Sequence, residues 1–498
     1  MRVIIAARRS ELARIQAFQV GEALGKAQPQ LCIDYSFHES LGDRNQTDPL
    51  WQMPEKGVFT QDLREGLRQG HFDLAVHSWK DLAIEDDPDT EIAATLPRAD
   101  SRDLLLVRSE RWDEATRTGR LRILTSSPRR SYNLEMFLPE VLPAKLKELE
   151  FVPVRGNVPT RVRKMWEPDV DGLVVAKAAL DRLLGAEQAE FSDTKSKLRH
   201  ALAQCRWMVL PLRANPAAPG QGALAIEIKR DRKDLRDLLN LSNCSETYEA
   251  VLREREILRA FGGGCHQKIG VSVLRRPYGE ITSLRGLTEE GATLSSYSLY
   301  SARPQPPKVL REQMWPLELA QTHWFTREKI PLTMPDKPAA FWISKAEALP
   351  TGVQPAPTQI VWTSGIQTWK RLAQRGVWVN GSAESLGEQE DARIDNFIDA
   401  ELSWFKLTHA NGYKENGMQT LATYALVPKH DNPDLKLQKY FFWTSGSGFE
   451  RALALNPWLK EKTHFCGPGN TQRILARNGV EPFIFLDHAQ WLEEMRLS

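Results

Sequence analysis

Residues 3–23, VIIAARRSELARIQAFQVGEA, decide how the chain begins to fold. The first five are apolar, as in a buried strand, and the basic turn Arg8-Arg9-Ser10 follows them. Apolar residues then recur at roughly helical spacing, at Leu12, Ile15, Val20 and Ala23. Ser10 is placed to cap this helix. The stretch therefore predicts a strand, a basic turn and a helix.

The same order of strand, polar turn and helix returns further along the chain. Strand-like segments lie near 33–37, 73–76, 123–124, 152–154 and 172–175, and helix-like segments lie near 60–69 and up to residue 183. Alternating strands and helices predict α/β sheets that are largely parallel. Because ligands bind at the strand ends of such sheets, the loops after the strands are the expected place of functional residues.

The composition excludes several classes of protein. The 498 residues are 41% hydrophobic and 26% charged, which suits two to four folded domains. A net charge of +2 gives no bulk attraction to nucleic acid or to an anionic membrane. The five cysteines and ten histidines have no metal-ligand spacing, and no apolar run is long enough for a membrane span. We expect a cytoplasmic, monomeric enzyme without a metal ion.

A linker and a separate C-terminal region are expected in the last third of the chain. Prolines interrupt the periodic pattern at 304, 306, 307, 331, 335 and 338. Beyond residue 338, VWTSG at 361–365 and FWTSG at 442–446 each precede helix-like sequence. These two segments predict a pair of related strand-turn-helix units.

Basic residues gather between 121 and 165, where nine Lys or Arg stand against four Glu. Arginine offers a planar fork that matches carboxylate and phosphate groups, so the cluster predicts a ligand with several anionic groups. A solvated basic face would give the same count. Arg129 and Arg130 favour the ligand, because they follow an expected helix start at Pro128, where cations are unfavourable unless an anion lies between them.

Two further segments carry candidate chemistry. HSWKD at 77–81 ends a strand and places Lys80 beside Asp81, which helps to keep this carboxylate ionised. A surface Lys-Asp pair is the plain alternative. In 262–265, three glycines precede Cys265 and leave room for a bulky group to approach its sulfur. A buried, inert cysteine is the alternative there.

Nine motifs in the first 300 residues have a characteristic order and spacing. They are ARRSELA (7–13), GD (42–43), KGVFT (56–60), HSWKD (77–81), DSRD (100–103), TSSPRR (125–130), RGN with TR (155–157, 160–161), GQGA (220–223), and ER leading to GGC (254–255, 263–265). In this order they resemble the hydroxymethylbilane synthase family, also called porphobilinogen deaminases.

The resemblance implies an α/β fold with two lobes like periplasmic binding proteins and a small α+β domain. Residues 1–95 with 190–217 would form the first lobe, 96–189 the second, and 218–325 the cofactor-carrying domain with a linker. A dipyrromethane cofactor would be attached to Cys265 as a thioether. The implied substrate, porphobilinogen, carries an acetate and a propionate, so a growing chain gains two carboxylates per ring.

The resemblance also assigns roles to single residues. Asp81 would be catalytic and would stabilise the cation formed as ammonia leaves; four condensations and a hydrolysis would release linear hydroxymethylbilane. The cofactor would be bound by Cys265, Lys80, Ser127, Arg129 and Arg130. The substrate side chains would be bound by Arg8, Ser10, Lys56, Arg102, Arg155, Arg161 and Arg182.

Residues 338–498 resemble uroporphyrinogen-III synthase, an α/β family that closes the linear tetrapyrrole with inversion of one ring. The likeness rests on WVNGSAE at 378–384, WTSGSGF at 443–449 and CGPGNT at 466–471. It implies a fused second enzyme with a candidate site at Tyr424, Ser445 and Asn470. The alternative is a degenerate domain in which Ser445 only caps a helix.

A non-catalytic protein that binds an anionic small molecule is the rival hypothesis, because the implied two-lobed fold also serves binding alone. Asp81 and Cys265 distinguish the two hypotheses. A binding protein needs the arginines but no covalently attached dipyrromethane.

Overall fold

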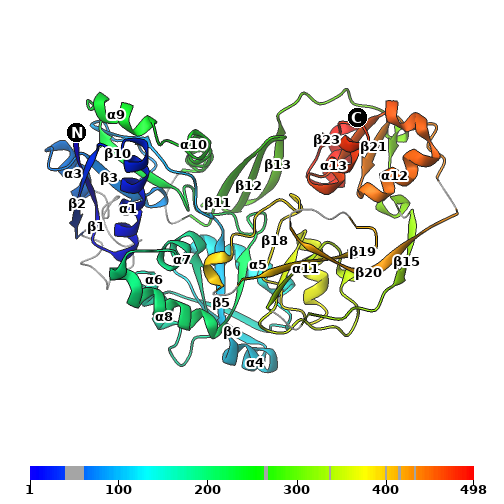
Figure 1. The fold of residues 1–498 in the computed structure, drawn as a ribbon, viewed down its shortest axis with the longest axis horizontal. Coiled ribbons are helices and arrows are strands. Elements are labelled where there is room, and N and C mark those ends of the chain that lie inside the picture. The colour runs from blue at the N-terminus through cyan, green and yellow to red at the C-terminus, as the bar shows by residue number, and fades with distance from the viewer. Residues whose placement is uncertain are drawn as a thin grey trace.

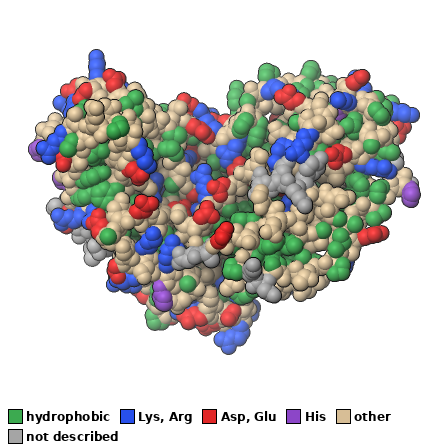
Figure 2. All heavy atoms as spheres, viewed as in Figure 1, with side chains coloured by type: hydrophobic (Ala, Val, Ile, Leu, Met, Phe, Trp, Pro, Cys, Tyr) green, Lys and Arg blue, Asp and Glu red, His purple; other side chains and the backbone are tan. Residues whose placement is uncertain are grey.

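The computed structural model describes residues 1–39, 61–262, 267–322, 324–335, 338–398, 401–412, 417–430 and 433–497. These residues form five β-sheets, with the N-terminal part at the left of Figure 1 and the C-terminal region at the right. Basic and acidic side chains are mixed over the face drawn in Figure 2, in keeping with the near-neutral net charge. No helix among the described residues is long and apolar enough to cross a membrane.

The first lobe is built on a five-stranded sheet. Its order is β2 (Cys32–His38), β1 (Arg2–Arg8), β3 (Leu74–Ser78), β10 (Leu224–Lys229) and β4 (Thr90–Ala94). The first three strands are parallel, and β10 runs antiparallel to both of its neighbours. Helix α1 (Glu11–Ala27) follows β1, and Ser10 caps it by accepting a hydrogen bond from the Ala13 amide. The strand, turn and helix predicted from residues 3–23 are thus confirmed.

The second lobe repeats this arrangement. Its sheet has the order β7 (Glu148–Val152), β6 (Arg120–Leu124), β8 (Gly172–Ala176), β5 (Asp103–Arg108) and β9 (Cys205–Leu210). Its helices include α5 (Pro128–Val141), α6 (Val158–Lys164), α7 (Lys177–Leu184) and α8 (Ser192–Ala203). As predicted, α5 begins at Pro128 behind its cap Ser127. Again the fourth strand, β5, is antiparallel to its neighbours.

The chain crosses between the lobes in two segments. The first crossing, residues 95–102, leads from β4 to β5, and the second crossing, residues 211–223, leads from β9 to β10. The prediction that 190–217 belongs to the first lobe is wrong, because α8 and β9 lie in the second lobe. The chain re-enters the first lobe only with β10. β9 and β10 are both short and largely apolar, so the sequence pattern alone does not select the sheet that each one joins.

A third body lies between the first lobe and the C-terminal region (Figure 1). It contains α10 (Ser245–Arg259) and the antiparallel sheet of β11 (Gly270–Arg276), β12 (Gly279–Leu287) and β13 (Thr293–Ser301). Glu254 of α10 is fully buried and fastens this body to both crossings. Its carboxylate pairs with Arg98 and accepts hydrogen bonds from the amides of Gly220 and Val273.

The C-terminal region contains two mostly parallel sheets. One has the order β15 (Phe325–Lys329), β20 (Gln419–Pro428), β19 (Ser403–His409), β16 (Ala339–Ile343), β17 (Ile360–Thr363) and β18 (Gly381–Ser382). The other has the order β14 (Met314–Trp315), β21 (Tyr440–Trp443), β22 (Thr463–Cys466) and β23 (Phe483–Ile484). The predicted strand-turn-helix pair is present, because β17 leads to α11 (Ile366–Ala373) and β21 leads to α12 (Gly446–Leu455).

The C-terminal sheets begin earlier than the predicted boundary at residue 338. Strands β14 and β15 precede that residue, yet they pair with β21 and β20. The prolines that predicted a linker lie in the loops before and after these strands. The two strands are too short to be recognised from a periodic pattern alone. The region therefore spans about residues 314–497.

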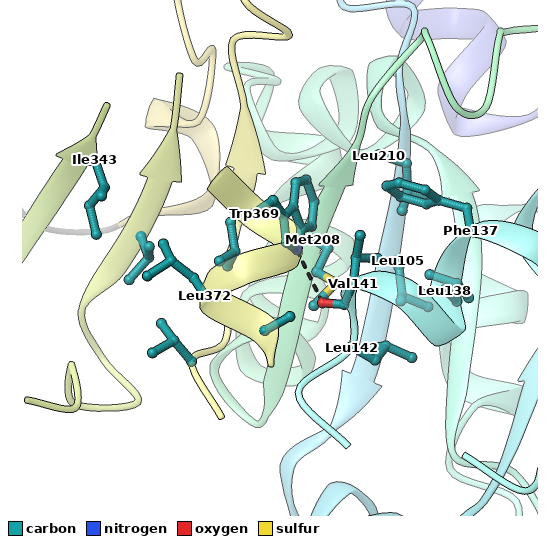
Figure 3. Packing of buried hydrophobic residues seen from close by; sticks show 14 of the residues in the cluster. Leu105, Phe137, Leu138, Val141, Leu142, Met208, Leu210, Ile343, Trp369 and Leu372 are labelled. Atoms are coloured by element: carbon teal, nitrogen blue, oxygen red, sulfur yellow. Dashed lines mark hydrogen bonds between the residues drawn. The ribbon is translucent and has the colours of Figure 1, made fainter. Parts of the chain in front are cut away.

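The C-terminal region packs on the second lobe through a shared apolar core. Trp369 of α11 is fully buried against α5, and its indole N–H donates to the Val141 carbonyl oxygen at 3.1 Å (Figure 3). Beside it, the Val209 amide of β9 donates to the Asn380 carbonyl oxygen at 2.7 Å. The second lobe and the C-terminal region are therefore joined through their interiors.

Replacement of Trp369 by alanine is expected to destabilise this joint. A buried aromatic side chain truncated to alanine costs about 3–5 kcal/mol of unfolding free energy, and the Val141 carbonyl also loses its donor. Urea unfolding of the full chain measures the loss. Trp369→Phe keeps most of the apolar contact and serves as the control; an alanine variant as stable as the phenylalanine variant would contradict this packing argument.

Candidate functional site

The loops that follow the parallel strands of both lobes supply the basic residues of the site. After β3, the 3₁₀ turn Trp79–Asp81 carries Lys80 and Asp81. After β6, the first turn of α5 carries Arg129 and Arg130. The second crossing runs close to the first of these loops, because a Cβ atom on Gly220 would lie 3.2 Å from the Lys80 amide nitrogen.

Asp103 is the centre of the buried part of the site. Its two carboxylate oxygens accept hydrogen bonds from Arg129 at 2.9 Å and from Arg130 at 2.7 Å. The side-chain amides of Asn215 and Gln221 each donate to it at 2.8 Å. Burial alone would raise the pKa of Asp103, but Arg129 and Arg130 outweigh it and hold this pKa well below its usual range. Asp103 thus orients both guanidinium groups as a permanent anion.

Lys80 lies beside this cluster with little to balance its charge. Its ammonium group donates to the Gln221 side-chain oxygen at 3.3 Å. Burial lowers the pKa of Lys80 to about 8; Asp81 opposes this shift, while Arg130 and Arg129 add to it. Asp81 itself is exposed. The pair therefore combines a cation that titrates near neutral pH with an accessible carboxylate.

Two further arginines, the half-buried Arg161 and the buried Arg182, have lowered pKa values. Arg161 donates to the Gly156 carbonyl oxygen at 2.7 Å, and burial together with Arg130 and Arg155 lowers its pKa to about 10. Arg182 donates to the Gly222 carbonyl oxygen at 2.8 Å, and burial lowers its pKa to about 10. Depressed pKa values on arginine indicate that additional negative charge would be favourable here.

The electrostatic neighbours of these groups place them together. The pKa values of the cations in this group depend on one another directly or through a common neighbour. The cations are Lys80, Arg129, Arg130, Arg155 and Arg161, and the acidic members are Asp81 and Asp103. We call these seven residues the cationic site. With five cations and two carboxylates, it suits a ligand that carries several carboxylates. Arg182 is not one of these residues; it contacts the second crossing at the Gly222 carbonyl oxygen.

Two of the predicted ligand-binding residues, Ser10 and Ser127, also have a structural role. Ser10 and Ser127 cap helices α1 and α5 by accepting backbone hydrogen bonds at 3.4 Å. Arg8 is the last residue of β1. For both serines, the structure provides the capping role that their sequence context predicts.

Arg102, which the resemblance assigns to substrate binding, contacts other parts of the chain. Its guanidinium pairs with Asp100 at 2.7 Å, donates to the Ala392 carbonyl oxygen at 2.9 Å, and lies 5.6 Å from the centre of the Trp362 ring. Ala392 and Trp362 belong to the C-terminal region, so Arg102 holds that region against the first crossing. The sequence places an arginine at this site but cannot reveal which neighbour covers it.

Lys56 and Cys265 lie outside the described residues. The strand that follows the Cys265 segment is nevertheless close to the cationic site. A Cβ atom on Gly270, the first residue of β11, would lie 3.0 Å from the Arg129 side chain and 2.3 Å from the Pro216 carbonyl oxygen. Gly270 is five positions beyond Cys265 in the sequence.

Three residues that organise the site were not predicted from the sequence. Asp103, Asn215 and Gln221 are fully buried and hydrogen-bonded to its cations. Asp103 and Gln221 stand inside the quoted motifs DSRD and GQGA, which was the available signal. Asn215 had no such signal, because an asparagine between prolines reads as an ordinary loop residue.

Tyr424 lies in one sheet of the C-terminal region, whereas Ser445 and Asn470 lie at helix starts that follow strands of the other sheet. Tyr424 of β20 is buried, with the Arg327 guanidinium 5.5 Å from its ring centre. Ser445 caps α12 by accepting a hydrogen bond from Gly448 at 3.3 Å. Asn470 begins α13 (Asn470–Arg477), and its side-chain oxygen is buried without a hydrogen-bond partner among the described residues.

Comparison with known proteins gives consistent matches. Residues 3–237 match the family model described as porphobilinogen deaminase, dipyromethane cofactor binding domain. A porphobilinogen deaminase from Syntrophomonas wolfei is 34% identical over 304 residues, which cover 61% of this chain and 89% of that protein. A probable porphobilinogen deaminase from Methanopyrus kandleri is 32% identical, covering 62% and 94%.

Among solved structures, a probable amino-acid ABC transporter extracellular-binding protein from Bacillus subtilis covers 52% of this chain and 97% of its own. The TM-score is 0.26 and the identity is 9%. A likeness this weak carries no argument about either fold or function.

Proposed function

Because the chain belongs to the porphobilinogen deaminase family, we propose that it joins four porphobilinogen molecules head to tail, with loss of ammonia, and releases linear hydroxymethylbilane by hydrolysis. One structural observation supports the proposal independently of the family. The five cations of the cationic site carry more positive charge than its two carboxylates balance. A substrate with one acetate and one propionate supplies the missing negative charge.

The protein carries a dipyrromethane cofactor, since the matching family model is the cofactor-binding domain. The residues present fit this group, because the Nε atom of Arg130 is buried and has no hydrogen-bond partner among the described residues. When bound, dipyrromethane supplies the pyrrole carbon to which the first substrate is joined. We assign its attachment to Cys265. We assign its carboxylates, together with carboxylates of the porphobilinogen that is joined to it, to Lys80, Arg129 and Arg130, with Ser127 at the same helix start.

Arg161 and Arg155 would bind the carboxylates of the incoming porphobilinogen, and Arg182, Arg8 and Lys56 stay predictions of the resemblance. Guanidinium groups fixed by backbone carbonyls, as Arg161 is by Gly156, bind carboxylates without first having to be ordered. Placement of the substrate in this way leaves its aminomethyl group to be set against Asp81.

Asp81 would act when the carbon–nitrogen bond of porphobilinogen breaks. The electron pair leaves with ammonia, and the positive charge left on the substrate is shared with its pyrrole nitrogen. The Asp81 carboxylate accepts a hydrogen bond from this N–H and stabilises the charge. Lys80 lies next to Asp81 in the same turn. Formation of the new carbon–carbon bond then releases a proton from the attacked pyrrole carbon, and the departed ammonia takes this proton up as ammonium.

The affinity for porphobilinogen is expected to fall as the pH rises through about 8. Lys80 has its pKa lowered to about 8, so it is charged below that pH and neutral above it. If only the charged form binds the acidic ligand, the apparent KM rises about tenfold between pH 7 and pH 9. Initial-rate measurements across this range test the prediction. Lys80→Arg stays charged and should flatten the rise; an unchanged rise in that variant would assign it to another group.

The proposed function itself is tested by incubation of the full chain with porphobilinogen. We expect one ammonia released per substrate consumed, and successive mass increments on the protein. Absence of ammonia release, with the substrate bound but unchanged, would favour the rival hypothesis of a non-catalytic anion-binding protein.

For the C-terminal region we propose closure of hydroxymethylbilane to uroporphyrinogen III. The supporting observation is a group of cations around Tyr424. Burial, Lys406 and Lys345 lower the pKa of His409, the last residue of β19. The Arg327 guanidinium lies over the tyrosine ring. Such a group suits an acidic tetrapyrrole. Isomer analysis of the oxidised product tests the proposal: type III supports it, and type I alone refutes it.

A further inference from the structure

A short segment of the C-terminal region is hydrogen-bonded to the second crossing. Glu384, two residues beyond β18, is buried, and its carboxylate oxygens accept hydrogen bonds from the backbone amides of Leu212 at 2.9 Å and Arg213 at 2.6 Å. Each oxygen therefore fixes one amide of the crossing. Burial raises the pKa of Glu384, and the hydrogen bonds from Arg213 and Leu212 oppose this shift.

The backbone around Glu384 is held in an unfavourable conformation. Glu384 and Ser385 have φ angles of 53° and 65°, and Arg393 has a φ angle of 53°. Among the described residues, these are the three non-glycine residues with positive φ. Such strain persists only where the surroundings determine the conformation, and it is typical of functional segments. The Glu384 amide is fixed in turn by the Ser382 hydroxyl oxygen at 3.0 Å.

The second crossing continues from Leu212 and Arg213 directly into the cationic site. Two residues later, the Asn215 side chain and the Pro216 carbonyl oxygen accept hydrogen bonds from Arg129 at 3.3 and 2.6 Å. Further along, Gln221 binds both Lys80 and Asp103. The positions of Arg129 and Lys80 thus depend on where the crossing lies.

We propose that Glu384 of the C-terminal region is a positioning residue for the cationic site of the deaminase part. By fixing the crossing at Leu212 and Arg213, it sets the acceptors that orient Arg129 and Lys80 for the carboxylates of the ligand. The inference rests on the proposed deaminase function. It makes the fused region part of the deaminase machinery, through a contact about 170 residues away in sequence.

Glu384→Gln in the full chain tests the proposal. Glutamine keeps the size of the side chain but has one acceptor oxygen, so one crossing amide loses its bond. We expect hydrogen exchange of peptides that span residues 207–216 to accelerate about tenfold, which corresponds to the loss of one hydrogen bond. The KM for porphobilinogen should rise about fivefold while kcat changes less than about twofold, because carboxylate binding is weakened without a change in the chemical step.

Two further variants keep the test decisive. Glu388→Gln is the matched control, since Glu388 lies in the same segment but pairs with Lys406 inside the C-terminal region; it should leave both the exchange and KM unchanged. Ser382→Ala releases the Glu384 amide while keeping its carboxylate, and it should move both readouts in the same direction by a smaller factor. This milder variant decides the matter if Glu384→Gln fails to fold.

The outcomes separate the inference from the function on which it rests. Exchange that stays at the wild-type rate, or that accelerates without any change in KM, overturns the positioning role. A purely structural role would lower the melting temperature and leave KM unchanged. If the wild-type chain releases no ammonia from porphobilinogen, the proposed function fails; if it turns over normally and only the Glu384→Gln prediction fails, the inference alone is lost.

Discussion

The Cys265→Ser variant is expected to be isolated with the mass of the bare polypeptide and to have no measurable turnover. The family model covers a cofactor-binding domain, and Cys265 is our assignment of the attachment atom. A serine hydroxyl is a far weaker nucleophile than a thiolate at neutral pH, so the thioether cannot form. Intact-protein mass spectrometry and ammonia release measure the two effects.

Cys32→Ser is the matched control for this prediction. Cys32 is an exposed thiol of the first lobe, so it tests whether any accessible cysteine acquires the added mass. We expect it to keep both the mass and the turnover. Retention of the added mass in Cys265→Ser would mean that another residue carries the cofactor, and turnover without any added mass would remove the cofactor from the proposal.

The local parts of the fold could be predicted because short-range patterns determine them. The strand at Arg2–Arg8, the Ser10 cap and the helix start at Pro128 follow from apolar runs, capping residues and proline geometry. The strand-turn-helix pair of the C-terminal region was found in the same way. Each of these features depends on residues within about one helical turn of one another.

The pairing of distant segments could not be predicted in this way. β9 pairs with β5 in the second lobe rather than joining the first. The two strands are about 100 residues apart, so no short-range pattern in the sequence indicates their pairing. Arg102 belongs to a predicted motif, but its guanidinium is taken by Asp100 and Ala392. The covering segment is almost 300 residues away, and no periodicity in the sequence indicates it.

The residues of the candidate site likewise differ in whether a local sequence pattern indicates them. Lys80, Asp81, Arg129 and Arg130 were found because motifs and loop positions mark them. Asp103 was overlooked as a site residue, although it orients both arginines. A buried aspartate next to an arginine in sequence reads as a local ion pair, and only the fold places it between two other guanidinium groups.

The second large effect is expected for Asp81→Asn, which should lower kcat about a thousandfold while the protein keeps its added mass. The asparagine side chain has nearly the same shape but no charge to oppose the positive charge that develops as ammonia leaves. Loss of one group that stabilises charge in the transition state typically costs 10²–10³-fold in rate, that is about 3–4 kcal/mol. Single-turnover ammonia release separates this effect from substrate binding.

A second readout ties Asp81 to its neighbour. Asp81 raises the pKa of Lys80, so its neutralisation should move the pH-dependent rise in KM to lower pH. Asp86→Asn removes an exposed carboxylate five residues away and should change neither kcat nor the pH profile, whereas Asp81→Glu keeps the charge and should recover part of the rate. If Asp81→Asn keeps more than about a tenth of the wild-type kcat, electrostatic stabilisation by this carboxylate is too small to be the principal source of catalysis, and the role would pass to another acid of the site.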